Sequence, residues 1–243
     1  MCFSEKQSYI NSIMLLMGSM YVYPKYKLSI LLIFLALKDL IQGLLYHYQG
    51  NEKMEHILTV LSWVHICFQP LMVNIAFSYF SKNNYTYWYI IYAICFIYAI
   101  YTLTTLKKFD IQNDPNCSVE NIESIASFIQ GRDNKNTNDF CSKETTSYMG
   151  KYHIAYQFKR DNDVLFFPIM YGILMFIPCL FTDARLLSIL WGVFVGIIYI
   201  VFRNIGEGEK AAIWCFLSII FLLPVCIFNK QVSKILLYWN KIF

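Results

Sequence analysis

Seven long apolar stretches constrain what this chain can fold into more than any other feature of its sequence. A helix that crosses the hydrocarbon core of a bilayer needs about 20 mainly apolar residues. Stretches of roughly this length lie at 8–23, 27–47, 57–80, 86–106, 164–181, 185–202 and 210–229. The first is the weakest because Tyr9, Asn11 and Ser12 interrupt it, so six spans is the alternative to seven.

The composition agrees with a membrane location. Hydrophobic residues make up 57% of the 243 residues and charged residues 15%, whereas soluble domains average roughly 45–50% and about 25%. A soluble protein with so few charges could not cover its surface, and the chain is too apolar to be disordered or fibrous. We therefore predict an all-α fold: a polytopic membrane helical bundle of seven transmembrane helices, which forms one domain over residues 1–243.

One long polar segment, residues 107–163, separates the fourth and fifth predicted helices. It contains no apolar run of spanning length, so we expect a water-exposed loop or cap, with one short amphipathic helix near residues 119–129. Cys117 and Cys141 lie in this loop and form a disulfide if this face of the membrane is oxidising. Two free thiols in a reducing compartment are the alternative, and we expect the disulfide.

Lysine and arginine residues near the ends of spans favour the cytoplasmic side. If the N-terminus and the 107–163 loop are outside, the inner cations are Lys25, Lys27, Lys82, Arg185, Lys230, Lys234 and Lys241. The short outer segments then contain Lys6, Lys53, Arg203 and Lys210. Cations within the long loop oppose this orientation, yet we expect the N-terminus and the loop on the outer or lumenal side. The net charge of +4 reflects these flanks, so the expected partner is the lipid bilayer and no nucleic acid.

Polar side chains interrupt the second and third predicted helices. Asp39 and Gln42 share one helix face, as do His65 and Gln69. An ionisable group at bilayer depth costs about 2.5–3.5 kcal/mol on insertion scales, so it needs a partner or a function. Asp39 lies eight residues before residue 47 and His65 eight residues after residue 57. Both are then about 12 Å from the shared end, so we expect them to meet. The alternative is a buried pair of Asp39 with Lys38 or His65 that only fixes helix packing.

The four histidines fall in the same half of the predicted bundle, whichever way it is inserted. They are His47, His56, His65 and His153, and Glu209 belongs to the same half. A polar pocket that opens to this face is therefore the expected binding site. Its candidate lining residues are Asp39, Gln42, His65, Gln69, His153 and Glu209.

Five short motifs give the chain a resemblance to a known family. They are Met1-Cys2-Phe3-Ser4, Asp39-Leu-Ile-Gln42, His65-Ile-Cys-Phe-Gln-Pro70, Gly150-Lys-Tyr-His153-Ile-Ala-Tyr156 and Glu209-Lys-Ala-Ala-Ile-Trp214-Cys215. In this order they resemble an uncharacterised family of small seven-helix membrane proteins from bacteria and large DNA viruses. That family begins with Met-Cys-Trp-Ser and has His-Ile-x-Phe-Gln-Pro and Trp-His-Ile-Ala-Trp motifs.

This chain departs from the family pattern at a few positions. Trp is replaced by Phe3, Tyr152, Tyr156 and Lys210, and Glu is replaced by Asp39. Only Lys210 changes the character of the side chain, which puts the packing around Glu209 in doubt. The resemblance implies that the candidate residues and Cys2 form one recurring set, but it implies no activity.

We weigh three functions, in this order. The first is binding or sensing of a small polar ligand or a metal ion in the pocket, and the second is a structural membrane protein whose polar set only packs. The third is a metal-dependent intramembrane hydrolase, similar to the ceramidase and adiponectin-receptor class. In it His65 and His153, with Glu209 or alternatively Asp39, would bind zinc or iron. The chain lacks the three-histidine spacing of that class and contains no HExxH or GxSxG motif, so enzymatic activity is left open.

Overall fold

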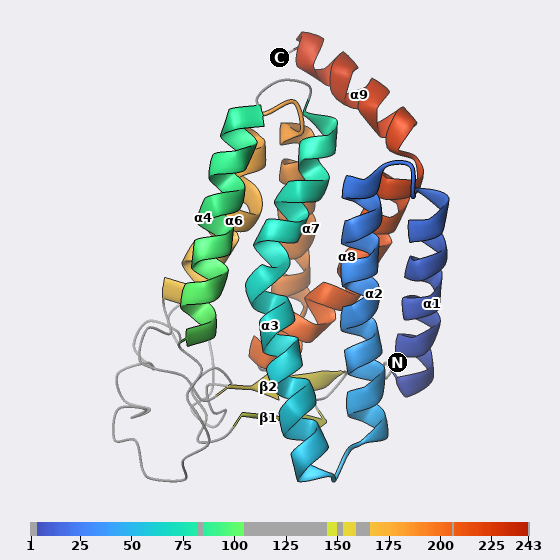
Figure 1. Cartoon of the computed structure of the whole chain (residues 1–243), viewed down its shortest axis with the longest axis vertical. Coiled ribbons are helices and arrows are strands. Elements are labelled where there is room, and N and C mark those ends of the chain that lie inside the picture. The colour runs from blue at the N-terminus through green and yellow to red at the C-terminus, as the bar shows by residue number, and fades with distance from the viewer. Residues whose placement is uncertain are drawn as a thin grey trace.

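The computed structural model describes residues 4–81, 85–104, 145–149, 153–158, 166–205 and 207–242. This part of the chain is a bundle of helices with a two-stranded hairpin at one end and a helix lying across the other end (Figure 1). The helices of the first half are α1 (Glu5–Tyr21), α2 (Tyr26–His47), α3 (Glu52–Phe77), the 3-10 turn η1 (Ser78–Phe80) and α4 (Tyr85–Thr104). Those of the second half are α6 (Phe166–Leu180), α7 (Arg185–Val201), α8 (Glu207–Ile227) and α9 (Asn229–Ile242).

All seven predicted apolar stretches form helices, although not all of them are long enough to span a bilayer. Among the described residues, α2, α3 together with η1, and α4 have the length and composition needed to cross a membrane. The helices α8 and α9 meet the same test only as a pair, and they are bent by 87° relative to each other. Because α6 and α7 are shorter apolar helices, the structure supports a helical bundle with several candidate spans but does not establish seven.

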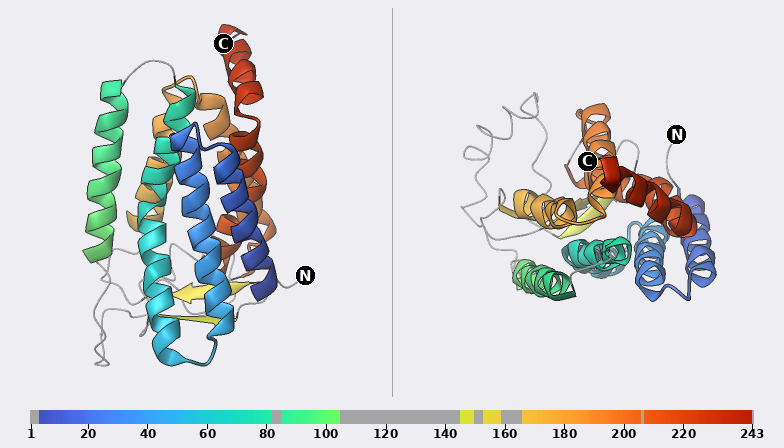
Figure 2. Two further views of the ribbon diagram at one scale, coloured as in Figure 1. Left: turned by 45° about the vertical axis from the view of Figure 1, so that its right-hand side comes forward. Right: turned by 90° about the horizontal axis from the view of Figure 1, so that it is seen from above.

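Consecutive helices pack against one another, and α8 closes the arrangement. Contacts join α1 to α2, α2 to α3, α3 to α4 and α6 to α7, while α8 contacts α1, α2 and α7 (Figure 2). The helix α4 lies at the edge of the bundle and exposes Ile90, Ile94 and Ile97. Soluble monomers rarely leave an extended apolar face of this kind uncovered, so this face is suited to contact lipid.

The turn between α2 and α3 positions the two helices that contribute most candidate residues. Gly50 has a φ of 87°, a left-handed conformation that favours glycine. Asn51 caps α3 by accepting a hydrogen bond from the Met54 backbone N–H at 3.2 Å, and the Glu55 carboxylate accepts one from the Gly50 N–H at 2.8 Å. These bonds satisfy backbone donors at the start of α3, so the helix begins at Glu52 and not at the predicted residue 57.

The described residues are predominantly helical, as predicted, and a short hairpin accompanies the helices. Strands β1 (Thr146–Met149) and β2 (Ile154–Gln157) pair antiparallel, with Thr146 opposite Gln157. They belong to the segment 107–163 that we predicted as a loop or cap, and they pack against α3 and α8 (Figure 1). The predicted helix at 119–129 and the predicted Cys117–Cys141 disulfide lie outside the described residues.

A close contact between α1 and α2 depends on the absence of a side chain at Gly43. A Cβ atom at this position would lie 2.6 Å from a ring carbon of Tyr9. We expect Gly43→Val to destabilise the protein by about 1–3 kcal/mol, because overpacking forces the two helices apart. The thermal unfolding midpoint of the detergent-purified protein, followed by circular dichroism, measures the effect. Gly196→Val in α7 is the control, since no atom lies within 4 Å of its Cβ position. Equal losses in both variants would contradict the predicted close contact.

Candidate functional site

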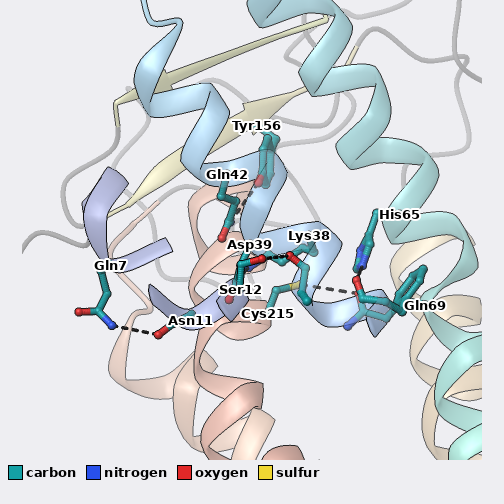
Figure 3. A network of polar contacts seen from close by, with 12 residues as sticks. Gln7, Asn11, Ser12, Lys38, Asp39, Gln42, His65, Gln69, Tyr156 and Cys215 are labelled. Carbon is teal, nitrogen blue, oxygen red and sulfur yellow. Dashed lines mark hydrogen bonds and ion pairs between the residues drawn. The ribbon is translucent and has the colours of Figure 1, made fainter. Parts of the chain in front are cut away.

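A charged pair lies inside the bundle on α2. The Lys38 ammonium is 3.3 Å from the Asp39 Oδ1 atom, and both side chains are almost completely buried. Asn11 of α1 lies near the same carboxylate, and its Oδ1 atom accepts a hydrogen bond from Gln7 at 2.9 Å (Figure 3). Burial of the carboxylate away from water requires such partners, so α1 and α2 are joined by polar contacts as well as by apolar packing.

Gln42 connects α2 to the hairpin. Its Nε2 atom donates a hydrogen bond of 3.0 Å to the Tyr156 hydroxyl, and both residues are buried (Figure 3). Ser62 of α3 lies near the same hydroxyl, and its own hydroxyl donates a hydrogen bond of 3.0 Å to the Leu58 carbonyl oxygen. Burial raises the pKa of Tyr156 well above its usual value of 10, so the hydroxyl stays protonated and can donate as well as accept.

His65 does not meet Asp39 as we expected. Its ring stacks on Phe34, with centroids 3.7 Å apart, and its Nε2 atom lies 2.9 Å from the Phe34 carbonyl oxygen. The prediction was wrong because α3 begins five residues earlier than residue 57. His65 is thirteen residues from Glu52, at the start of α3, and Phe34 is thirteen residues from His47, at the end of α2. His65 and Phe34 therefore lie at the same distance from the turn that joins the two helices. A carbonyl can only accept, so Nε2 carries the proton and Nδ1 of the neutral ring is an acceptor.

Gln69 connects α3 to α6 and α8 through a single oxygen. Its Oε1 atom accepts a hydrogen bond from the Tyr171 hydroxyl at 2.7 Å and a weaker one from the Cys215 thiol at 3.6 Å.

Asn74 lies about one and a half turns further along α3, and both ends of its side-chain amide are hydrogen-bonded. Its amide donates to the carbonyl oxygens of Pro70 and Leu174 at 2.8 Å, and its Oδ1 atom accepts from Cys179 at 3.7 Å. Asn74 is therefore satisfied at both ends and belongs to packing.

His153 and Glu209 are brought together, although not by the imidazole ring. The backbone N–H of His153 donates a hydrogen bond of 2.9 Å to Glu209 Oε1 at the start of α8. The imidazole packs near the rings of Tyr46 and Phe216, at centroid distances of 6.0 and 5.8 Å. Burial lowers the pKa of His153 from 6.5 to about 3, and the positive charge of Lys38 acts in the same direction. His153 is therefore neutral at pH 7.

All six candidate residues are buried, so the site is closed and not open to one face as we expected. Asp39, Gln42, Gln69 and His153 have no exposed surface, and His65 and Glu209 are only 6% and 3% exposed. The physical reason is the hairpin, which covers this end of the bundle (Figure 1). His56 Nδ1 lies 2.9 Å from the Thr145 carbonyl oxygen, and the Trp63 ring packs on Phe158 at 4.6 Å.

Four of the candidate residues each have one buried polar atom with no hydrogen-bond partner among the described residues. These atoms are Asp39 Oδ2, Gln42 Oε1, His65 Nδ1 and Gln69 Nε2. Gln42, His65 and Gln69 each use their other polar atom to bond another segment, whereas Asp39 Oδ1 pairs with Lys38 of the same helix. The first three atoms are acceptors and the fourth is a donor. An unsatisfied buried polar atom typically costs about 1–3 kcal/mol. Further atoms of this kind lie outside the candidate set, for example the hydroxyl oxygens of Ser8, Thr59 and Ser218.

The described residues offer no preformed metal centre. No group of three or more His, Cys, Asp or Glu side chains within them is arranged to bind a metal ion. The zinc or iron site at His65, His153 and Glu209 is therefore a prediction without geometric support. Five cysteines, namely Cys67, Cys95, Cys179, Cys215 and Cys226, are buried free thiols of the described helices.

Two residues of this network were not predicted from the sequence. Tyr171 lies in the apolar helix α6, and Ser62 lies among the apolar residues of α3. A hydroxyl group in a helix that is otherwise apolar is the signal that could have identified them. With 19 tyrosines in the chain, that signal alone does not separate Tyr171 from residues at the membrane interface.

The comparisons with known proteins agree with an uncharacterised family. A family model with the description "Family of unknown function (DUF5765)" matches residues 8–235, a range that includes all six candidate residues. None of the curated proteins or solved structures that were compared matches the chain.

Loss of the Glu209 carboxylate should release the hairpin. We expect Glu209→Ala to speed amide hydrogen exchange of residues 153–157 by about tenfold, because one charge-assisted hydrogen bond stabilises by roughly 1.5–3 kcal/mol. Hydrogen-exchange mass spectrometry of the detergent-purified protein measures this change. Glu52→Ala, an exposed carboxylate at the same end, is the control. Unchanged exchange in Glu209→Ala would show that the bond does not secure the hairpin.

His153 should make the protein less stable in mild acid. The unfolded chain binds a proton at this residue below pH 6.5, whereas the folded protein binds it only near pH 3. The free energy of unfolding should therefore fall as the pH drops below 6.5, by up to about 1.4 kcal/mol per pH unit. His153→Gln should reduce this loss in thermal midpoints measured at pH 7.5 and 5.5. The exposed His47→Gln is the control, and identical pH profiles for wild type and His153→Gln would refute the assignment.

Proposed function

Since this chain belongs to the DUF5765 family, whose function is unknown, we propose that it is an integral membrane protein that binds a small polar ligand. The ligand site lies between α2 and α3, beneath the hairpin. One observation carries the proposal. Four candidate residues each have one polar atom that bonds another protein group and a second, buried polar atom without a partner among the described residues: Asp39, Gln42, His65 and Gln69.

The membrane location rests on length and surface chemistry. The helix α2 has 22 residues, so it is about 33 Å long and matches the hydrocarbon core of a bilayer. On the outside of the bundle, α1 and α7 expose Met17, Met20, Ile200 and Val201. These side chains are expected to contact lipid, because an aqueous surface of this kind would aggregate.

The distribution of cations supports an orientation with the N-terminus and the hairpin outside. In the described residues, the end of the bundle near α9 contains Lys25, Lys27, Arg185, Lys230, Lys234 and Lys241. The end near the hairpin contains Lys6, Lys53, Arg203 and the buried Lys210. The larger number belongs on the cytoplasmic side, which favours the α9 end inside.

The ligand that fits best donates more hydrogen bonds than it accepts. Asp39 Oδ2, Gln42 Oε1 and His65 Nδ1 would accept bonds from it, while Gln69 Nε2 would donate one. A small ammonium compound or a polyol has this character. Because the hairpin covers the site, entry of the ligand requires the hairpin to move, and this movement would give the protein a way to sense occupancy.

A purely structural role is the second candidate, and one observation favours it. The Lys38–Asp39 pair already neutralises its own charge inside the bundle, as a packing pair would. If these polar residues only stabilise helix packing, small solutes should not reach them. The hydrolase alternative has no comparable support, since it requires a metal centre among His65, His153 and Glu209.

The rate at which a small cationic reagent reaches a buried thiol distinguishes a ligand-binding function from a purely structural one. Cys215 lies 3.6 Å from Gln69 Oε1, whereas Cys226 lies eleven residues further along α8, which is about 20° away around the helix. Both thiols are buried, so variants that retain only one or the other form a matched pair. The probe is 2-aminoethyl methanethiosulfonate, a small reagent that carries an ammonium group.

We expect the variant with Cys215 alone to react at least about tenfold faster than the variant with Cys226 alone, which corresponds to roughly 1.4 kcal/mol. Mass spectrometry of the intact protein follows the reaction. Thermal midpoints close to that of wild type confirm that both variants are folded. Equal rates for the two thiols would contradict a site that small cations can enter and would favour the structural role.

A further inference from the structure

A groove of about 590 Å³ lies at the end of the bundle opposite the hairpin. It is formed where α4 begins, where α6 turns into α7, and where α9 crosses the bundle. Its principal lining residues are Tyr87, Leu180, Phe181, Asp183, Arg185 and Asn240. It shares no residue with the candidate site, and its volume falls within the range of about 300–1,000 Å³ that is typical of small-molecule sites.

The groove presents one charge of each sign. Arg185 begins α7, and this helix has no side-chain cap at Ala184, so its first turn adds the positive end of a helix dipole. Asp183 lies two residues earlier, and its backbone carbonyl accepts a hydrogen bond from Asn240 at 3.2 Å. Its Oδ1 atom lies 3.5 Å from the same Asn240 amide. These bonds fix the α9 wall of the groove against the α6–α7 turn.

The remaining wall of the groove is apolar. Phe181 is 77% exposed, and Leu180 precedes it at the end of α6. Tyr87 donates a hydrogen bond of 2.6 Å to the Pro178 carbonyl oxygen, so its ring is fixed at the same level. Aromatic and apolar side chains next to charged groups, here at the ends of the candidate span α4 and of the shorter apolar helices α6 and α7, are characteristic of the headgroup region of a bilayer.

We infer that this groove binds the headgroup of a phospholipid that carries both a phosphate and a primary amine, as in phosphatidylethanolamine. Arg185 and the first turn of α7 bind the phosphate, since a guanidinium can bond two phosphate oxygens at once. Asp183 accepts hydrogen bonds from the amine, and Phe181 and Leu180 contact the beginning of the acyl chains. The inference rests on the membrane location proposed above, but not on the ligand site beneath the hairpin.

Competition among defined lipids tests this assignment. The full-length protein, purified in detergent, is exposed to equal amounts of phosphatidylethanolamine, phosphatidylcholine and phosphatidylglycerol, and native mass spectrometry counts the retained lipids. We expect wild type to retain phosphatidylethanolamine about fivefold over the other two, since one added charge contact near a membrane surface is worth roughly 1 kcal/mol. Arg185→Gln should lower the retention of all three lipids. Asp183→Asn should abolish the preference for phosphatidylethanolamine and raise the share of anionic phosphatidylglycerol.

Arg203→Gln, an exposed arginine just beyond the opposite end of α7, is the matched control and should leave the lipid pattern unchanged. Thermal midpoints near that of wild type show that the groove variants are folded. Identical lipid patterns in wild type and Asp183→Asn would overturn the assignment of the amine to Asp183. If alkaline washing strips the protein from its host membranes, the proposed membrane location itself fails, which is a separate outcome from an unchanged lipid pattern.

Discussion

Burial of the Asp39 carboxylate inside an apolar bundle is the constraint on which the rest of the structure depends. A buried charge is costly unless it is paired and hydrogen-bonded. The Lys38 ammonium at 3.3 Å supplies the countercharge, and Asn11 supplies a polar contact from α1. Other buried polar groups inside the bundle also need hydrogen-bond partners. Gln42 bonds the hairpin, and Gln69 bonds α6 and α8. The polar network therefore determines which segments meet beneath the hairpin.

Much of the fold could be predicted from the sequence, because apolar stretches of about 20 residues have few alternatives to a helix in a bilayer. The hairpin could not. Its strands are only four residues long and lie in a polar segment with no clear alternation of apolar and polar residues. The 87° bend before α9 was also missed, since residues 229–242 mix lysine with apolar residues and no proline or glycine follows Pro224.

The sequence predicts a set of candidate residues, but it does not predict the contacts that they make. Asp39, Gln42, His65 and Gln69 were identified because polar groups at bilayer depth are conspicuous. Their partners were not, because depth was counted from the end of an apolar stretch, whereas the caps at Asn51 and Glu55 start α3 five residues earlier. His65 consequently contacts Phe34. The contact of Glu209 with His153 uses a backbone N–H, which every residue except proline carries, so no side-chain pattern could reveal it.

The two ends of the molecule differ in chemistry. Toward the hairpin end, the candidate residues of α2 and α3 are buried, and four of them have a polar atom without a partner among the described residues. The α9 end carries the larger number of cations and an open groove with charges of both signs. A protein built in this way would contact lipid at its cationic end and recognise a small solute at the other end, with Gln42 and Tyr156 coupling the solute site to the covering hairpin.

The most direct test of this account is a double-mutant cycle between Gln42 and Tyr156, measured as the free energy of unfolding of wild type, Gln42→Leu, Tyr156→Phe and the double variant. The account predicts a coupling energy of about 0.6 kcal/mol or more, since measured couplings of hydrogen bonds between membrane helices average about 0.6 and reach about 1.7 kcal/mol. Strictly additive losses would contradict it, because the hairpin and α2 would then not share the polar site.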